Sequence, residues 1–142
     1  DAQLSMPYRF KTKGEMLVQC ADQSLLTSYA CDTTSCGRFR TYNRTHCGRC
    51  VPCMVRKAAI QRWGLSDTTR YKFSALSGAG KTSADDPMAV ACAVLAAEQR
   101  GIDSFLGATL AFASDADRPH YRRVAEQGLA ELAALLRRDG VL

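Results

Sequence analysis

The chain has 142 residues, of which 46% are hydrophobic and 23% are charged, and its formal net charge is +5. These values are typical of a globular protein and argue against a disordered chain, and the length is enough for one domain with a modest core. No run approaches 18 apolar residues, so the sequence predicts no membrane-spanning helix and no membrane partner. The chain shows no signal peptide and begins with Asp1 rather than Met, so we expect a truncated, processed or split product.

The first half of the chain is predicted to contain two helical regions separated by a loop. Thr12-Lys13-Gly14-Glu15 has the S/T-x-x-E pattern of a capping box, which predicts one helix or two short ones over about 13–28. Residues 29–50 carry few apolar side chains and are predicted to form a loop. A helix is then predicted over 51–63, because Gly64 follows it at the position where many helices end in a left-handed residue.

The second half is predicted to be a linker followed by helices. Residues 65–84 are rich in Ser, Thr and Gly and are predicted to be loop, with at most a short helical turn at 67–72. Helices are predicted over 87–100, about 103–113 and about 115–139. The last of these repeats apolar residues at intervals of three and four, which is typical of a packing face: Tyr121, Val124, Ala125, Leu129, Leu132, Leu135 and Leu136. We find no alternating strand, so the chain is predicted to be mostly helical.

The cysteines carry the strongest chemical signal. Seven cysteines, an odd number, without a signal peptide indicate a reducing, cytoplasmic environment and a metal rather than a disulfide framework. Cys47, Cys50 and Cys53 follow one another with two residues between each pair, and Cys36 lies upstream with ten residues between it and Cys47. A C-x2-C turn lets two thiolates reach one ion, and zinc takes four N or S ligands in a closed structural site. The pattern predicts zinc held by these four cysteines in a knuckle over residues 31–56.

Other interpretations of the cysteines stay open. The cysteines could instead be free buried thiols or disulfides, although pairing all of three cysteines within seven residues by disulfides would strain the geometry. An iron–sulfur cluster is disfavoured because the final Cys followed by Pro is missing. Cys31 could replace Cys36 as a ligand, although Cys36 is preferred, and His46 could also substitute. Cys20 and Cys92 lie on predicted apolar faces and are expected to be core thiols.

Positive charge is concentrated around the predicted knuckle. No Asp or Glu occurs from Thr33 to Ser66, and the same span contains seven basic side chains: Arg38, Arg40, Arg44, Arg49, Arg56, Lys57 and Arg62. Such a loop could bind phosphate or a nucleic acid, with Phe39, Tyr42 and Trp63 available for stacking. It could equally be a solvated loop whose charges offset the thiolates. A zinc-ribbon nucleic-acid-binding module is therefore an alternative function, although a ribbon usually has two C-x2-C knuckles.

One further motif is discounted. The residues from Ala75 to Thr82, ALSGAGKT, match a relaxed Walker A pattern with Ala in place of the first Gly. A working loop of this kind follows a buried strand and opens directly into a helix. Tyr71-Lys72-Phe73-Ser74 is a poor buried strand, and the next predicted helix begins about five residues after Lys81. We therefore interpret this stretch as a loop rather than a nucleotide site.

The order of these features resembles the C-terminal part of the 7-cyano-7-deazaguanine synthase (QueC) family. Lys13-Gly14-Glu15-Met16 is similar to the K-x-E-(apolar) helix start of that family, and Thr33-Thr34-Ser35-Cys36 is similar to its T-x-S/T-C. The third piece, CGRCVPCMVR from Cys47 to Arg56, is similar to its CG-x-C-x2-C-x2-R. The match covers roughly residues 7–64. The Cys36–Cys47 interval is slightly longer than usual, and the helical tail from about 85 to 142 is not part of the ordinary enzyme. The stretch HCGRCVPCMVRKAA with such a tail is more similar to the QueC-like proteins of anti-phage operons of the Qat type (QatC).

This resemblance implies a function and a set of site residues. The family has a Rossmann-like α/β domain of the PP-loop ATP pyrophosphatase type and adenylates a 7-deazaguanine carboxylate with ATP and Mg, after which an amine displaces AMP. The four cysteines of the family hold one structural zinc. By position, the corresponding residues of this chain are Cys36, Cys47, Cys50 and Cys53. Arg49, Arg56 and Lys13 are candidate contacts to phosphate or substrate. The family's S-G-G-x-D-S loop for ATP does not occur in this sequence.

The resemblance also predicts how the chain is organised. Residues 1–64 would be the C-terminal part of the QueC-like domain, residues 65–84 a linker and residues 85–142 a helical tail. The expected partners are an N-terminal ATP-binding portion on the same or another chain, a 7-deazaguanine-type small molecule and a protein bound through the last helix. A helical interaction module stapled by zinc is a third interpretation of the same features.

Overall fold

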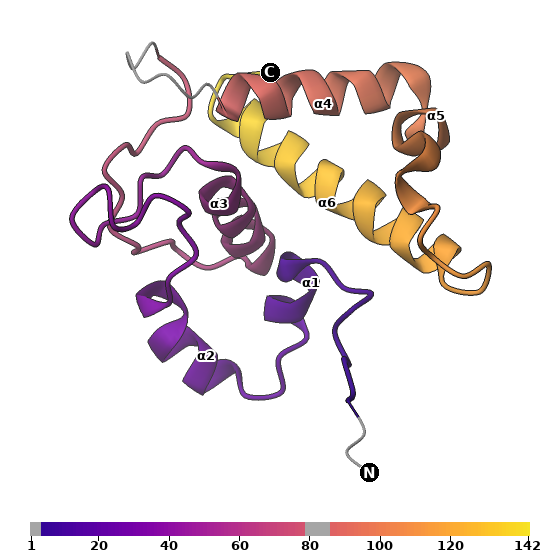
Figure 1. The fold of residues 1–142 in the computed structure, drawn as a ribbon. Coiled ribbons are helices and arrows are strands. Elements are labelled where there is room, and N and C mark those ends of the chain that lie inside the picture. Colours follow the sequence, from indigo (N-terminus) through magenta and orange to yellow (C-terminus); the bar gives the residue numbers. More distant parts are fainter. Residues whose placement is uncertain (1–3, 79–85) are drawn as a thin grey trace.

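The computed structural model describes residues 4–78 and 86–142 and is mostly helical, as predicted (Figure 1). Its helices and 3-10 turns are α1 (Lys13–Val18), α2 (Gln23–Tyr29), η1 (Ala30–Asp32), α3 (Val51–Trp63), α4 (Asp86–Arg100), α5 (Ile102–Leu106), η2 (Gly107–Leu110) and α6 (Arg118–Arg138). Within the described residues, the β structure is a single isolated bridge between His46 and Tyr71. A Rossmann-like sheet is therefore not part of the described chain.

The predicted helix over 13–28 is two short helices, and side-chain caps explain both starts. The Thr12 side chain accepts the backbone N–H of Glu15, and the Glu15 carboxylate accepts the N–H of Thr12, which completes the predicted capping box. The Asp22 carboxylate accepts the N–H of Leu25 at 2.8 Å and begins α2. Because Asp22 caps a new helix, the chain turns between Val18 and Gln23 instead of continuing.

Helix α3 has the bounds predicted from the sequence. Cys50 is its N-cap, and Gly64 ends it with a left-handed backbone at φ 84°. The helix lies between two clusters of side chains. Cys53 belongs to the cysteine cluster, whereas Met54 and Ala58 belong to the hydrophobic core.

The hydrophobic core joins α3 to α4 and α6, which lie beside one another in Figure 1. Leu135 and Leu136 of α6 are fully buried in it, so part of the predicted apolar stripe packs inside the molecule. Leu76 also enters this core and ties the segment after α3 to the helices. Residues 65–78, predicted as a linker, thus carry a core side chain although they form no helix.

Two local details differ from the sequence predictions. Residues 67–72 were predicted to be loop with at most a short helical turn, and this stretch forms the loop without the turn, with Lys72 N–H donating to the carbonyl of His46 at 2.8 Å. Pairing with the knuckle loop replaces local hydrogen bonds there. A helix was expected over about 103–113, but α5 ends at Leu106, because Gly107 has a positive φ of 46° and a 3-10 turn follows.

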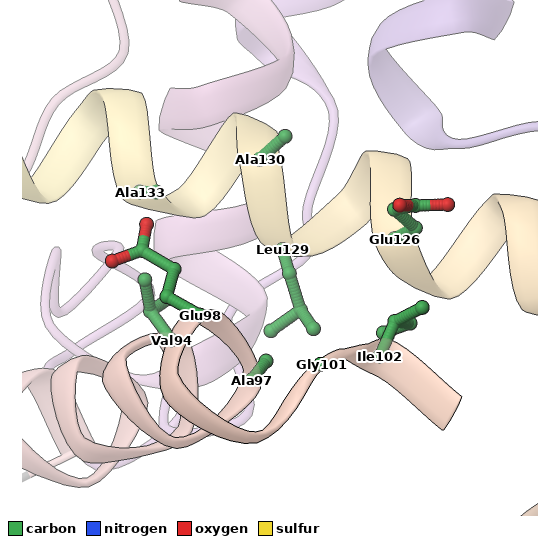
Figure 2. Close-up of a pocket in the computed structure, with 9 residues that line it drawn as sticks. All are labelled: Val94, Ala97, Glu98, Gly101, Ile102, Glu126, Leu129, Ala130 and Ala133. Atoms are coloured by element: carbon green, nitrogen blue, oxygen red, sulfur yellow. The ribbon is translucent and has the colours of Figure 1, made fainter. Parts of the chain in front are cut away.

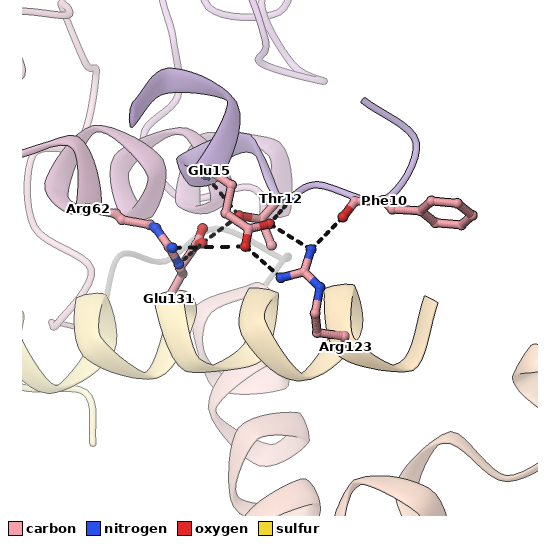
Figure 3. A network of polar contacts seen from close by, with 6 residues as sticks. All are labelled: Phe10, Thr12, Glu15, Arg62, Arg123 and Glu131. Carbon is pink, nitrogen blue, oxygen red and sulfur yellow. Dashed lines mark hydrogen bonds and ion pairs between the residues drawn. The ribbon is translucent and has the colours of Figure 1, made fainter. Parts of the chain in front are cut away.

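Buried charges connect the N-terminal part of the chain to α6 (Figure 3). Arg123 donates to Glu15 at 2.6 Å, and Thr12 Oγ1 donates to Glu131 at 2.6 Å. Arg62 of α3 donates to the same Glu131 at 2.9 Å. Three helices and the residue that caps α1 therefore share one network.

Gly14 allows this close approach. A Cβ atom there would lie 2.6 Å from Cδ of Arg62 and 2.8 Å from a carboxylate oxygen of Glu131. The absence of a side chain at Gly14 lets α1, α3 and α6 meet around Glu131.

Among the described residues, no helix combines the length and the apolar character needed to cross a membrane.

Candidate metal centre

The four predicted cysteines meet at one point of the structure. Cys36 comes from the loop after η1, Cys47 and Cys50 from the turn before α3, and Cys53 from its first helical turn. Their Sγ atoms all lie within 4.8 Å of one another, and the Cys47–Cys53 and Cys36–Cys50 pairs are each 3.9 Å apart. The side chains are between 0% and 7% exposed. A short loop and one helix end thus bring four buried sulfurs together.

This arrangement fits a metal ion such as zinc. Zinc lies about 2.3 Å from each thiolate in a tetrahedral site, which places neighbouring sulfurs about 3.8 Å apart. The observed separation of 3.9 Å in two of the pairs agrees with that geometry. Four sulfur donors would complete the coordination sphere, which is characteristic of a structural rather than a catalytic zinc.

Backbone amides point at the sulfurs. The N–H groups of Arg38 and Cys47 donate to Cys36 Sγ at 3.3 and 3.2 Å. The N–H groups of Arg49 and Cys50 donate to Cys47 Sγ at 3.5 and 3.3 Å. Amide donors stabilise thiolates, the form in which cysteine binds a metal.

The thiols differ in how easily they ionise. Burial alone would raise the pKa of Cys47, but the amides of Arg49 and Cys50 outweigh it and hold the pKa below the ordinary value of 9.0. Burial raises the pKa of Cys50 and, by more, that of Cys53. Metal binding to this cluster must therefore displace protons from Cys50 and Cys53, whose pKa values are raised.

Gly48, inside the C-G-x-C turn, has a backbone role that the motif alone does not explain. Its φ is +87°, a left-handed conformation that favours glycine. A Cβ atom at this position would lie 2.1 Å from the carbonyl oxygen of Phe73. Gly48 therefore lets the segment at Phe73 pack directly against the cysteine turn.

The remaining cysteines and His46 lie outside the cluster. Cys31 Sγ is 3.9 Å from a carboxylate oxygen of Asp67, so the structure places Cys36, and not Cys31, with the other three. His46 is buried edge-on to the rings of Phe39 and Tyr71 and is not one of the grouped donors.

Cys20 and Cys92 were expected to be core thiols. Cys92 is instead exposed on α4, because the buried face of that helix is formed by Val90, Ala91 and Val94. Cys20 is only partly buried, in the turn after α1.

Arg56 is buried, and its side chain links loops to α3 through hydrogen bonds rather than lying free on the surface. Its guanidinium donates to the carbonyl of Ala30 at 2.6 Å and to the Thr33 hydroxyl at 2.8 Å. It also donates twice to the Thr69 hydroxyl, at 3.0 and 3.1 Å. Four of its five N–H groups thus have acceptors, and the fifth has none in the part of the chain that the structure describes. No sequence pattern pointed to Thr69 as a partner of Arg56.

Lys13 and Arg56 line one cavity of about 170 Å³. Thr33 lies on the same wall, and the rest of the lining is mainly apolar: Met16, Leu17, Leu26, Ala30, Ala59 and Ile60. Arg49 lies elsewhere and donates to the carbonyl of Gly78 at 3.1 Å. The structure therefore brings two of the three candidate contacts together and separates the third.

Lys57, which the sequence placed only among the basic side chains around the knuckle, is a buried cation. Its ammonium donates to the carbonyl of Ser74 at 2.8 Å and lies 4.5 Å from the centre of the Tyr71 ring. Burial lowers its pKa. Lys57 fastens the segment after α3 against the helix, next to the cysteine cluster.

A separate hollow of about 310 Å³ lies between α6 and the junction of α4 and α5 (Figure 2). Its lining is mainly apolar, with Leu129 reaching toward Ala97 and Ile102. The two carboxylates on its rim are already paired, Glu98 with Arg137 at 2.6 Å and Glu126 with Arg122 at 3.0 Å. No unpaired charge among the described residues marks this hollow as a polar binding site.

Comparisons with family models, with curated proteins and with solved structures give no match to this chain.

Proposed function

We propose that this chain is the zinc-bearing C-terminal part of a QueC-like, ATP-dependent enzyme that adenylates a 7-deazaguanine carboxylate. The observation that carries the proposal is the cavity that Lys13, Thr33 and Arg56 share. Each of the three belongs to a different one of the sequence pieces that resemble the family. Pieces separated by up to 43 positions, from Lys13 to Arg56, thus converge on one small site.

The cavity has the character that such chemistry needs. A carboxylate becomes a good electrophile when it attacks the α-phosphorus of ATP, pyrophosphate leaves and an acyl-adenylate forms. Cations beside the reacting groups stabilise the negative charge on phosphate and carboxylate oxygens. Lys13 supplies an exposed ammonium, and Arg56 has one N–H group without an acceptor among the described residues. The apolar walls suit a planar heterocycle.

Zinc has a positioning role in this proposal. It would hold Cys36 against α3. Cys36 lies three residues after Thr33 in the same loop, and Arg56 donates a hydrogen bond to Thr33. Loss of the metal would therefore displace Thr33 and Arg56 from the cavity without removing a reacting group. ATP and Mg would be bound by an N-terminal ATP-binding portion, on the same or another chain. An amine, either ammonia or a protein amine as in a Qat-type protein, would displace AMP.

The test is formation of AMP from ATP and a 7-carboxy-7-deazaguanine, with this chain joined to its ATP-binding portion. Lys13→Ala is expected to lower the rate at least tenfold while the chain keeps one zinc, because a cation in contact with a reacting anion contributes about 1.4 kcal/mol or more. Lys11→Ala is the matched control, since Lys11 lies over the Tyr8 ring and outside the cavity. Equal rates for both variants, or no AMP with this substrate, would reject the proposal.

A further inference from the structure

Charge is distributed unevenly around the cysteine cluster. Residues 33–78 contain nine Lys and Arg side chains and one carboxylate, Asp67. Asp67 is already bonded to the Tyr71 hydroxyl at 2.7 Å and to the Thr69 amide at 3.0 Å. The four thiolates with one zinc would carry a net charge of about −2, which is too small to cancel this excess.

Four of these cations are exposed and lack an acidic partner among the described residues: Arg40, Arg44, Arg70 and Lys72. The others are engaged. Arg56 and Lys57 are buried, Arg62 pairs with Glu131, Arg38 pairs with Asp86 at 3.3 Å, and Arg49 donates to Gly78. We call the four free cations the basic knuckle face.

Two chain segments bring these four residues into one region. The loop that carries Arg40 and Arg44 lies alongside residues 70–74, since Phe73 N–H donates to the carbonyl of Cys47 at 3.1 Å. The His46–Tyr71 bridge is parallel and lies two residues from Arg44 on one segment and one residue from Arg70 and Lys72 on the other. The loop and the segment after α3 run together in Figure 1.

The local backbone directs the cations outward. Tyr71 packs against the cysteine cluster, and side chains alternate along an extended segment, so Arg70 and Lys72 point away from the cluster. Phe39 also packs inward, next to exposed Arg40. The rings of Tyr42 and Phe73 lie edge to face, with 5.8 Å between their centroids. Both side chains are half-buried between the two basic segments.

We propose that the basic knuckle face binds the phosphate backbone of a single-stranded nucleic acid. Exposed cations without acidic neighbours provide the electrostatic attraction that drives such binding. Partly exposed aromatic rings between them suit unpaired bases, which stack on such rings. The face is made of loop and extended segments and presents no helix that would enter a duplex groove, so a single strand fits it better. The inference does not depend on the proposed function.

The test is binding of a fluorescent oligo-dT strand to the zinc-loaded chain, measured by anisotropy from about 50 to 200 mM salt. If about four phosphates are neutralised, the logarithm of the affinity should fall against the logarithm of the salt concentration with a slope of about −3. R40A/R44A should bind more weakly and reduce that slope by about 1.4. R100A/R137A removes two exposed arginines of the helical tail and should leave both affinity and slope unchanged.

Three results would overturn the inference. The first is no binding at the lowest salt concentration. The second is an equal loss in the two double variants, which would mean that net charge alone attracts the strand. The third is a duplex that binds as tightly as the single strand. Zinc content, measured in both variants, separates a lost contact from a lost fold.

Discussion

The cysteine knuckle and the helical core are two neighbouring regions that become ordered by different means. In the core, Leu135 and Leu136 of α6 are fully buried among apolar side chains of α3 and α4. In the knuckle, the buried side chains are mainly the four cysteines, and Phe39, Tyr42 and Tyr71 pack against them only partly buried. The knuckle loop thus has few apolar residues to bury, and a metal held by the four cysteines would supply the stability that apolar burial supplies in the core.

Helix α3 belongs to both regions. Its first turn supplies Cys53 to the cluster, and the next turns supply Met54 and Ala58 to the core. Arg56 and Lys57 of the same helix donate hydrogen bonds to Thr33 and Ser74 and so hold both neighbouring loops against it. The two regions are therefore distinct in what stabilises them, although they are not separate in space.

The largest expected effect comes from removing one metal ligand. Cys50→Ser should lose the bound zinc, since three sulfurs leave the tetrahedron incomplete, and a structural zinc contributes on the order of 10 kcal/mol. Elemental analysis and hydrogen exchange check this, with protection expected to vanish first in residues 33–50. Cys92→Ser, at an exposed position of α4, is the control and should keep one zinc. A C50S protein with unchanged zinc and unchanged exchange would contradict the assignment.

The converse change weakens the core and leaves the knuckle intact. Leu135→Ala removes a fully buried side chain and should cost about 2–5 kcal/mol of unfolding free energy. The folded protein should still bind one zinc, because Leu135 does not contact the cysteine cluster. Urea unfolding and elemental analysis measure the two quantities. Leu95→Ala, at a side chain that is 42% exposed, should cost much less. Loss of zinc in folded L135A would show that the two regions are not independent.

A smaller effect is expected at Gly48, where two glycines with the same backbone can be compared. Gly48 and Gly64 have φ of +87° and +84°, so an alanine at either position costs about 1 kcal/mol through the backbone. Only at Gly48 does the added Cβ meet another segment, at the carbonyl of Phe73. Gly48→Ala should therefore release zinc to a chelator faster than wild type, and Gly64→Ala should not. Equal rates in both variants would exclude the Phe73 contact as a support of the site.

Gly48 also illustrates which features of the site can be predicted from the sequence and which cannot. The spacing of the cysteines predicted the four grouped sulfurs, because C-x2-C turns have a local geometry. The helices with caps, such as α1 after Thr12 and α3 before Gly64, were likewise predicted from local signals. The approach of Phe73 to Gly48 and of Thr69 to Arg56 joins residues far apart in the chain, and no local pattern encodes it. The pairing of Lys72 and Phe73 with the knuckle loop was missed for the same reason, since its partners, His46 and Cys47, lie about 26 positions earlier in the chain.

The smallest expected effect concerns the charges that link α1 to α6. The hydrogen bond from Arg123 holds the pKa of Glu15 below its ordinary value of 4.5, against the opposing effect of burial. The folded state therefore binds fewer protons than the unfolded state as pH falls below about 4.5, so stability that is present at neutral pH is lost in acid. Glu15→Gln keeps the capping geometry and removes the charge, which should cost about 1 kcal/mol at neutral pH, since Arg123 is half exposed.

Urea unfolding from pH 7 down to about pH 3 should show the E15Q curve meeting the wild-type curve in acid, as wild-type Glu15 becomes protonated. Glu126→Gln removes the exposed ion pair with Arg122 on α6, and its unfolding free energy should differ from that of wild type by less than about 0.5 kcal/mol. A difference between E15Q and wild type that stays constant with pH would mean that Glu15 acts through its shape and not its charge. The Glu15–Arg123 ion pair would then contribute nothing to holding α1 against α6, and the bonds of Thr12 and Arg62 to Glu131 would be the polar links that remain between these elements.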